Sequence, residues 1–313
     1  MDTLEEIRAR VKAETAKVVV GREAEVDLLL VSLLSAGHSL LEGVPGTSKT
    51  LLAKCFARTL GLSFKRVQFT PDMLPLDVVG GFVLNMKTKE IEFREGPVFA
   101  NVLLADEINR SPPKVQSALL EAMQEVQVTV EGHTRSLPYP FMVIATQNQV
   151  ETEGVYPLPE GQLDRFALKI PFGYQGRELE GSIIERNLSD MDLDVIEPAA
   201  TEAELRSAME GVKKVVISPD LIDYLARIAE FTRQDPRVDL GASPRAMVHL
   251  AHVSRAFAAL KGRGYVTPDD IKEMAPYVLG HRIKLKRASV LKGEVSSSQG
   301  FLADVLAQVK PPR

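Results

Sequence analysis

The sequence predicts an α/β domain built on a parallel sheet with two inserted β-hairpins, followed by an all-helical domain. Three observations predict this architecture. A glycine-bearing loop, residues 43–50, separates a short apolar strand from a helix. A second apolar strand, residues 101–107, ends in two acidic residues. Beyond the last strand only helical periodicities remain, so we expect domains at 1–174 and 175–313.

The elements of the first domain follow from the spacing of apolar residues and from turn signals. In the first segment Leu4, Ile7 and Val11 recur at helical spacing. The strands are short apolar runs, because a parallel sheet buries both of its faces. The predicted order is helices at 3–16 and 23–36, a strand at 38–42, a helix at 51–60, a strand at 63–69, a helix from 76, a strand at 101–107, a helix at 114–125, a strand at 141–145, a helix at 159–165 and a strand at 166–170.

Two further segments predict the inserted hairpins. Residues 82–93 alternate around a polar turn at 85–89, and residues 127–140 turn at Glu131-Gly132. The second domain shows helical periodicity throughout, with start signals such as Thr201 followed by Glu204. Its predicted helices are 178–188, 201–210, 219–233, 243–260 and 267–278.

The loop between the first strand and its helix has the layout of a nucleotide phosphate cradle. Its backbone N–H groups would surround phosphates, Lys49 would reach the β- and γ-phosphates, and the Thr50 hydroxyl would bind Mg²⁺. Ser48 stands where the usual pattern has glycine. A Gly-Pro turn that happens to carry a lysine is the structural alternative. The loop residues are Gly43, Val44, Pro45, Gly46, Thr47, Ser48, Lys49 and Thr50.

The acid-tipped strand supplies the second part of the predicted site. Ligands bind at the carboxyl ends of parallel strands, which places Asp106 beside the phosphate loop. Asp106 could hold Mg²⁺ through water, and Glu107 could act as general base toward an attacking water. Asn148, at the end of a neighbouring strand, could hydrogen-bond that water or the γ-phosphate. Arg245, at the start of a helix in the second domain, could fold back onto the nucleotide.

Composition narrows the function classes. The chain has 313 residues, a formal net charge of −4 and a pI of about 5.9, which argues against a dedicated nucleic-acid binder. Residues 283–287 form a local basic strip, which a solvated helix end explains as well as a nucleic-acid contact does. The single cysteine, Cys55, excludes an internal disulfide and a cysteine-based metal cluster. No apolar run has the length of a membrane helix and the N-terminus lacks a secretory core, so we expect a cytoplasmic protein.

Taken together these features resemble the AAA+ ATPases and, within them, the MoxR family. The resemblance covers about residues 15–285 and is carried by long stretches in a fixed order. These stretches are 68–72 (QFTPD), 96–100 (GPVFA), 104–110 (LADEINR), 119–125 (LLEAMQE), 162–166 (QLDRF) and 241–246 (GASPRA). Three positions depart from the family pattern, namely Ser48, Gln149 and Gly161.

The resemblance implies a role for each matching position. Lys49 and Thr50 correspond to Walker A, Asp106 and Glu107 to Walker B, Asn148 to sensor 1 and Arg245 to sensor 2. Val20 and Gly21 match the segment that contacts adenine. The hairpins match the helix-2 and pre-sensor inserts. Members use ATP, which they convert to ADP, with Mg²⁺, and form usually hexameric rings that remodel protein clients, commonly with a partner carrying a von Willebrand factor type A domain.

Arg165 is the candidate for an arginine that one subunit donates to the nucleotide of its neighbour. It ends a short helix at the expected subunit edge, and Arg110 is the runner-up. The alternative is a structural arginine paired with Asp164 or with a neighbouring carboxylate. For Asn148 and Arg245 the alternatives are a buried amide that bonds the backbone and a surface residue at a helix start.

Two other functions remain open from the sequence. One is a metal-insertion motor like the magnesium chelatase ATPase subunit, which shares these hairpins. The other is a nucleotide-gated assembly scaffold that binds ATP but turns it over too slowly to be a motor. A DNA translocase is disfavoured by the acidic pI, and the last ~20 residues carry no readable function.

Overall fold

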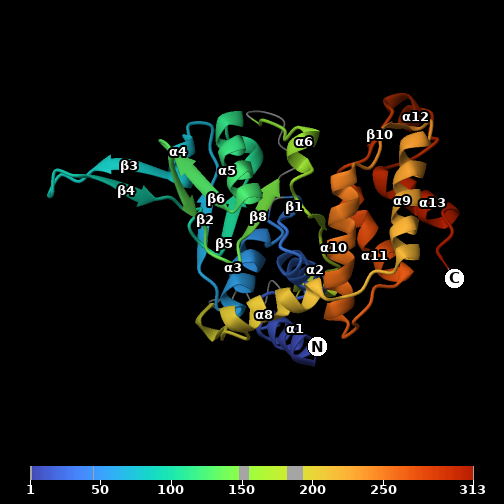
Figure 1. Ribbon diagram of the computed structural model, residues 1–313, viewed down its shortest axis with the longest axis horizontal. Helices are drawn as coiled ribbons and strands as arrows, with labels where there is room; N and C mark the ends of the chain where they lie inside the picture. The colour runs from blue at the N-terminus through green and yellow to red at the C-terminus, as the bar shows by residue number, and fades with distance from the viewer. Residues whose placement is uncertain (1, 45, 148–154, 182–192, 313) are drawn as a thin grey trace.

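The computed structural model describes residues 2–44, 46–147, 155–181 and 193–312. Within these residues the centre of the first half is a five-stranded sheet in the order β2-β5-β8-β1-β9, in which every neighbouring pair is parallel (Figure 1). Its strands are β1 (Ser39–Gly43), β2 (Phe64–Gln68), β5 (Val102–Asp106), β8 (Met142–Gln147) and β9 (Leu168–Phe172). The predicted α/β fold with a parallel sheet is therefore confirmed.

Each central strand contributes alternate residues to two separate hydrophobic layers, as a pleated strand covered on both faces must. In β5, Val102 and Leu104 join one layer, whereas Leu103 and Ala105 join the other. The first layer is covered by α1, α2 and α3 and the second by α4 and α5. These helices are α1 (Asp2–Ala16), α2 (Glu23–Leu34), α3 (Lys49–Thr59), α4 (Pro75–Val79) and α5 (Pro113–Glu125).

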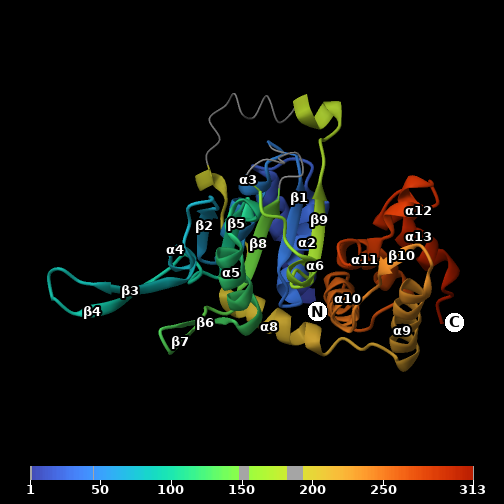
Figure 2. The ribbon, with the colours of Figure 1, turned by 90° about the horizontal axis from the view of Figure 1, so that it is seen from above.

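Both predicted hairpins are present and leave the same side of the sheet domain (Figure 2). The first pairs β3 (Gly80–Leu84) with β4 (Ile91–Glu95), and the second pairs β6 (Gln127–Val130) with β7 (His133–Ser136). Aromatic and cation–π contacts join the two hairpins: the Phe82 and His133 rings lie 5.3 Å apart, and the Arg135 guanidinium lies 4.3 Å from the centre of the Phe93 ring. The two inserts are thus packed against each other.

The second half contains the predicted helices, with starts set by side-chain caps. Thr201 and Glu204 form the expected capping box, and Ser218, Ser243 and Thr267 cap three further helices. Residues 177–181 are helical, and the rest of the predicted helix 178–188 lies outside the described residues. The described helices are α8 (Glu202–Lys213), α9 (Pro219–Gln234), α10 (Pro244–Leu260), α11 (Pro268–Leu279), α12 (Arg287–Leu291) and α13 (Ser298–Gln308).

The expectation of purely helical structure after residue 174 is wrong in one detail. A short antiparallel pair forms between β10 (Val238–Leu240) and β11 (Lys284–Leu285). The basic strip at 283–287 therefore lies on a strand and not only at a helix end. Strands of three and two residues are too short for alternation to reveal them.

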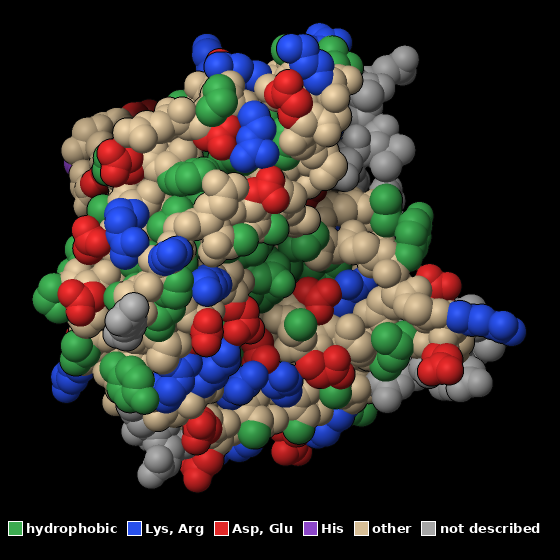
Figure 3. Space-filling view, turned by 90° about the vertical axis from the view of Figure 1, so that its right-hand side faces the viewer, with side chains coloured by type: hydrophobic (Ala, Val, Ile, Leu, Met, Phe, Trp, Pro, Cys, Tyr) green, Lys and Arg blue, Asp and Glu red, His purple; other side chains and the backbone are tan. Residues whose placement is uncertain are grey.

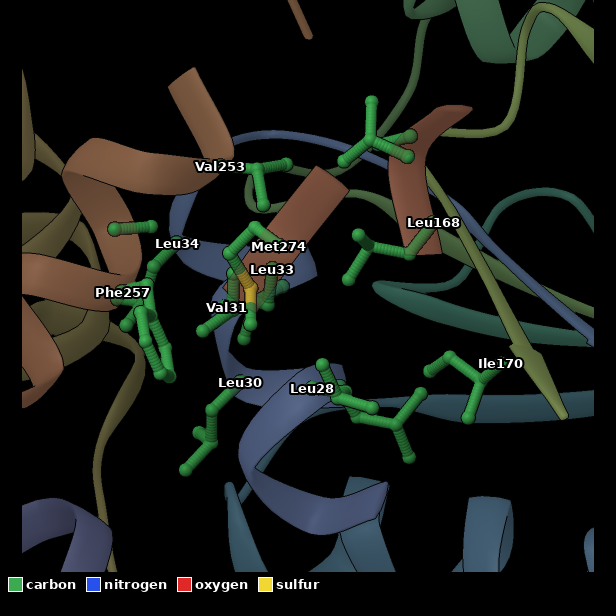
Figure 4. Packing of buried hydrophobic residues seen from close by; sticks show 14 of the residues in the cluster. Leu28, Leu30, Val31, Leu33, Leu34, Leu168, Ile170, Val253, Phe257 and Met274 are labelled. Carbon is green, nitrogen blue, oxygen red and sulfur yellow. The ribbon is translucent and has the colours of Figure 1, made fainter. Parts of the chain in front are cut away.

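One hydrophobic cluster connects the sheet to the helical half. It contains Leu168 and Ile170 of β9 together with Val253 and Phe257 of α10 and Met274 of α11. Figure 4 shows these side chains gathered around the apolar face of α2. The division at residue 174 stays a prediction, because no gap in packing marks it.

The molecular surface carries mixed charge. On the face shown in Figure 3, acidic and basic side chains are interspersed around a hollow in which hydrophobic side chains gather. None of the described helices is both long and apolar enough to cross a bilayer.

Three short elements lie in connecting segments. They are the 3₁₀ turns Ile108–Arg110 and Leu193–Val195 and the helix α6 (Glu160–Leu163).

Candidate functional site

The phosphate loop follows β1, and its backbone depends on unusual conformations. At Gly43 an added Cβ would lie 1.9 Å from the backbone oxygen of Phe172 in β9, so only glycine fits there. Gly46 has a φ of +76°. Ser48, the residue before α3, also adopts the left-handed conformation, with φ 63° and ψ 20°. This conformation explains why the usual pattern has glycine at that position.

Lys49 begins α3 and folds its side chain over the loop. Its Nζ donates to the backbone oxygens of Gly43 at 2.8 Å and Val44 at 2.9 Å. The Thr47 hydroxyl donates to the same Val44 oxygen at 2.9 Å. Burial lowers the pKa of Lys49, while the nearby carboxylates of Asp106 and Glu107 act in the opposite direction. The ammonium group is therefore held inside the loop that would contain phosphates.

Asp106 ends β5 and is the meeting point of three side chains. Its Oδ2 accepts from the Thr50 hydroxyl at 3.0 Å and from the Arg66 guanidinium at 2.8 Å. Its Oδ1 accepts from the Thr146 hydroxyl at 2.6 Å. A hydroxyl and a carboxylate side by side fit Mg²⁺, which usually binds one or two protein oxygens and completes its shell with water and substrate phosphates. Among the described residues no cluster of three or more metal-binding side chains offers an alternative.

Glu107 follows the strand in a left-handed conformation, with φ 57° and ψ 50°. Such a backbone at a non-glycine residue persists only where the surroundings impose it. Here the Glu107 N–H donates to the Thr146 hydroxyl at 2.8 Å. Its carboxylate accepts from Gln68 at 2.7 Å and from Arg110 at 3.0 Å. Both the backbone and the side chain of this carboxylate are therefore held in place.

These residues line one pocket of about 430 Å³ at the carboxyl ends of the strands. The structure thus brings together most of the phosphate loop, both acidic residues and two side chains from β2. The lining residues are Gly46, Thr47, Ser48, Lys49, Thr50, Leu51, Arg66, Gln68, Asp106 and Glu107. Pro45 and Asn148 lie outside the described residues, so the expectation for Asn148 stays a prediction.

Arg66, Gln68 and Thr146 were not identified from the sequence. Arg66 and Gln68 are two residues apart on β2 and pair in register with Leu104 and Asp106 of β5. Thr146 is the residue before the last in β8, which lies on the other side of β5. In the sequence, the only sign of these residues is that polar side chains lie in or near the ends of two apolar strands. The strand order β2-β5-β8 is needed to show that these two strands flank Asp106.

Val20, Gly21, Arg165 and Arg245 are not among the residues that line this pocket. The backbone oxygens of Val20 and Gly21 accept from the Gln175 amide at 3.2 and 3.0 Å, so this segment packs on the chain that follows β9. Arg245 is exposed in the first turn of α10. Arg165 follows α6 in a half-buried turn. Neither arginine lines the phosphate pocket of its own chain.

The alternative for Arg165, an ion pair with Asp164, is not what the structure shows. Asp164 instead pairs with Arg282, which follows α11, through a contact of 2.7 Å. Arg110, the runner-up, forms its ion pair with Glu107 of the same chain at 3.0 Å.

Comparisons with known proteins agree with this geometry. Residues 38–168 match the family model described as "ATPase family associated with various cellular activities (AAA)", and residues 230–299 match an AAA lid domain. The chain is 44% identical over 285 residues to Chaperone MoxR1 of Mycobacterium tuberculosis, covering 87% of this chain and 74% of that protein. It is 43% identical over 296 residues to YeaC of Bacillus subtilis, a protein described as uncharacterized, covering 95% and 92%.

A solved structure shows the same fold over the whole chain. The crystal structure of a protein from Cytophaga hutchinsonii described as an ATPase superimposes with a TM-score of 0.90 at 40% sequence identity. The match covers 100% of this chain and 98% of that one.

Proposed function

The chain belongs to the MoxR family of AAA+ ATPases, and we propose that it hydrolyses ATP to ADP and phosphate in a hexameric ring that remodels or assembles protein clients. The observation that carries the catalytic part is the arrangement of Thr50, Asp106 and Glu107. Two oxygens suited to Mg²⁺ and one positioned carboxylate share a pocket with Lys49.

In the proposed mechanism each group acts on one part of the reaction. Thr50 and Asp106 would hold Mg²⁺, which when bound would neutralise charge on the phosphates of the nucleotide. The Glu107 carboxylate takes a proton from water as the water oxygen attacks the γ-phosphorus. The bond from that phosphorus to the bridging oxygen breaks, and ADP leaves. Lys49 stabilises phosphate charge, and Asn148 and Arg245 take the sensor roles of the family.

Mutation of Glu107 tests the catalytic proposal. Loss of a general base costs about 10²–10⁴-fold in rate, so Glu107→Gln should bind ATP as wild type does yet release phosphate at least about 100-fold more slowly. Lys49→Ala should instead lose nucleotide binding. Phosphate release and nucleotide affinity, measured with Mg²⁺ and with EDTA, separate the two effects. Equal turnover by wild type and Glu107→Gln would contradict the role of Glu107.

The same measurement decides between motor and scaffold. A wild-type protein that binds ATP but releases no phosphate at any concentration would favour the nucleotide-gated scaffold. Release of phosphate that depends on Glu107 favours the motor. Nothing in the part of the chain that the structure describes favours a metal-insertion motor over this function.

The donated arginine is proposed to be Arg165. Arg110 is engaged with Glu107 within its own chain, and this pairing supports a role in holding the general base. Arg165 forms no ion pair among the described residues and lies outside its own chain's pocket. An arginine supplied in trans contributes about 10³–10⁵-fold in rate, so Arg165→Ala should lose nearly all turnover while it keeps ATP binding.

The hairpins are proposed to carry motion from the nucleotide site to a client. The β3–β4 hairpin projects from the sheet domain and exposes Leu84, Met86 and Ile91 at 57%, 82% and 73% (Figure 1). Exposed apolar side chains on a projecting element suit contact with unfolded or apolar protein segments. By family resemblance, a partner with a von Willebrand factor type A domain and a cytoplasmic location complete the proposal.

A further inference from the structure

The junction between the helical half and α6 contains a buried arginine that the proposed reaction does not use. Arg282 lies just after α11, and its side chain is only 2% exposed. Its guanidinium Nε donates to the Asp164 carboxylate at 2.7 Å. The Ser243 hydroxyl, at the start of α10, contacts the other oxygen of the same carboxylate at 3.4 Å. Two elements of the helical half therefore converge on one residue of the sheet domain.

The remaining donors of Arg282 bind backbone oxygens of the same short segment and of Val278 in α11. One terminal nitrogen donates to the oxygens of Asp164 at 3.0 Å and Phe166 at 2.6 Å, and the other donates to Ala167 at 3.3 Å. The neighbouring His281 ring nitrogen contacts the Phe166 oxygen at 3.1 Å. The helical half thus holds the backbone immediately before and immediately after Arg165.

Arg165 itself has little to fix its position. Its Nε is buried without a hydrogen-bond partner among the described residues. The preceding helix α6 spans only Glu160–Leu163 and has no fully buried residue, although Leu163 packs against the second hydrophobic layer. A helix of four residues has little stability of its own. The contacts that Arg282 makes on both sides of Arg165 therefore contribute to fixing its position.

We propose that Arg282 is a positioning residue that aims Arg165 at the nucleotide of the neighbouring subunit. The inference rests on the proposed role of Arg165 as the donated arginine. Any movement of the helical half on its own sheet domain would then move Arg165, so the state of one subunit would set the hydrolysis rate in the next. The planar guanidinium is required because a lysine cannot donate to several fixed oxygens at once.

The test uses full-length subunits mixed in pairs before ATP is added. Arg282→Lys keeps the charge but loses the fork of donors, and Arg282→Met removes both. Each should lower kcat by about tenfold or more, as a misplaced reacting group does, with the KM for ATP within about twofold of wild type. Lys284→Met is the matched control, since Lys284 also joins the helical half to α6, through Glu160, but is 55% exposed. It should keep wild-type turnover.

Mixed rings distinguish two effects of an Arg282 substitution: a misplaced Arg165 at the neighbour's nucleotide site, and damage to the subunit's own nucleotide site. A subunit with altered Arg282 keeps its own Glu107, and a Glu107→Gln subunit keeps a well-placed Arg165. Equal mixtures should therefore regain about a quarter of wild-type activity, because one interface in about four combines both intact parts in a closed ring. An Arg165→Ala and Glu107→Gln mixture provides the reference and should recover equally.

Two results would overturn the inference, and they can be told apart. If the Arg165→Ala mixture recovers but the Arg282 mixtures do not, Arg282 acts within its own subunit and only this inference fails. If the Arg165→Ala mixture does not recover, the donated arginine is not Arg165, and the proposed assignment fails with it. Thermal unfolding of each variant shows that it is folded, and Arg282→Lys carries the test if Arg282→Met does not fold.

Discussion

At the level of single residues, the phosphate loop holds a serine in a backbone conformation that favours glycine. An L-residue in the left-handed region costs about 1–2 kcal/mol, whereas glycine pays a smaller penalty through the entropy of the unfolded chain. Ser48→Gly should therefore raise the free energy of unfolding by up to about 1 kcal/mol. Ser48→Val should lower it by more than about 1 kcal/mol, because a branched side chain suits this conformation least. Urea unfolding of both variants would measure this, and a destabilised Ser48→Gly would contradict the conformational explanation.

Thr146 is a residue-scale prediction that only the fold reveals. Its hydroxyl donates to Asp106 and accepts from the Glu107 N–H, so Thr146→Val removes both contacts without changing the shape of the side chain. Residues that orient a catalytic group typically contribute about 10–100-fold, and we expect kcat to fall by that factor with little change in ATP affinity. Thr129→Val, on the exposed face of β6, is the control. Unchanged kcat in Thr146→Val would show that Glu107 is held by its side chain alone.

His38 gives the stability of the protein a dependence on pH. Burial lowers its pKa from the ordinary 6.5 to about 4, while the contact of its Nε2 with the Met123 backbone oxygen at 2.9 Å acts in the opposite direction. Its Nδ1 accepts from the Val143 N–H at 3.0 Å. A folded-state pKa below the unfolded value means that stability is complete above pH 6.5 and is lost as pH falls toward 4. The contribution of His38 to the free energy of unfolding should fall by about 2 kcal/mol between pH 7 and pH 5.

The matched substitution is His38→Gln, which removes the titrating ring. Its free energy of unfolding should change less between pH 7 and pH 5 than that of wild type, whatever its stability at pH 7. His133→Gln, at the exposed strand β7, should keep the wild-type dependence. Equal pH dependence in His38→Gln and wild type would show that His38 does not remain neutral on folding.

At the level of elements, the pairing of β1 with β9 explains why Gly43 cannot be replaced. A methyl group at this position would overlap the Phe172 backbone oxygen, which cannot move without breaking the sheet. Gly43→Ala should destabilise the protein by about 1–3 kcal/mol or more. Gly173→Ala is the control, because nothing lies within 4 Å of a Cβ there. Similar thermal stability of the two variants would contradict this account of the loop.

The β3–β4 hairpin should be divisible into a structural base and a dispensable tip. Replacing residues 84–91 with Asn-Gly should leave the unfolding temperature within about 2 °C, since the tip buries no apolar side chain among the described residues. Phe93→Ala, which removes the ring that contacts Phe82, Phe99 and Arg135, should cost about 1–3 kcal/mol. Strong destabilisation by the shortened tip would show that it packs on the domain.

The sequence predicted those elements whose signals are local. The loop at 43–50, the two acidic residues at 106–107 and both hairpins are contiguous patterns, and the structure contains all of them. The pair β10–β11 and the helix α12 were missed, because short elements carry too few residues for a period. The helix α13 was also missed, although it spans 11 residues, is capped by Ser297 and buries Phe301, Leu302 and Val305. The positions beyond 294 therefore proved more structured than the sequence indicated.

At the level of the whole molecule, contacts between residues that are far apart in the sequence could not be predicted. Arg282 reaches Asp164 across 118 positions, and Thr146 reaches Asp106 across 40. Neither residue belongs to a local motif, so only the strand order and the docking of the helical half bring the partners together. The phosphate loop and the acidic pair are contiguous motifs, whereas Thr146 and Arg282, which contact residues of the site from a distance in sequence, belong to none.

In the proposed ring, each nucleotide site is completed by a second subunit. ATP turnover per subunit should therefore be measured across protein concentration, with the oligomer mass recorded by sedimentation under the same conditions. We expect turnover to rise in step with ring formation, and Arg165→Ala to form the same ring without turnover. Full turnover at concentrations where the protein is monomeric would contradict this expectation.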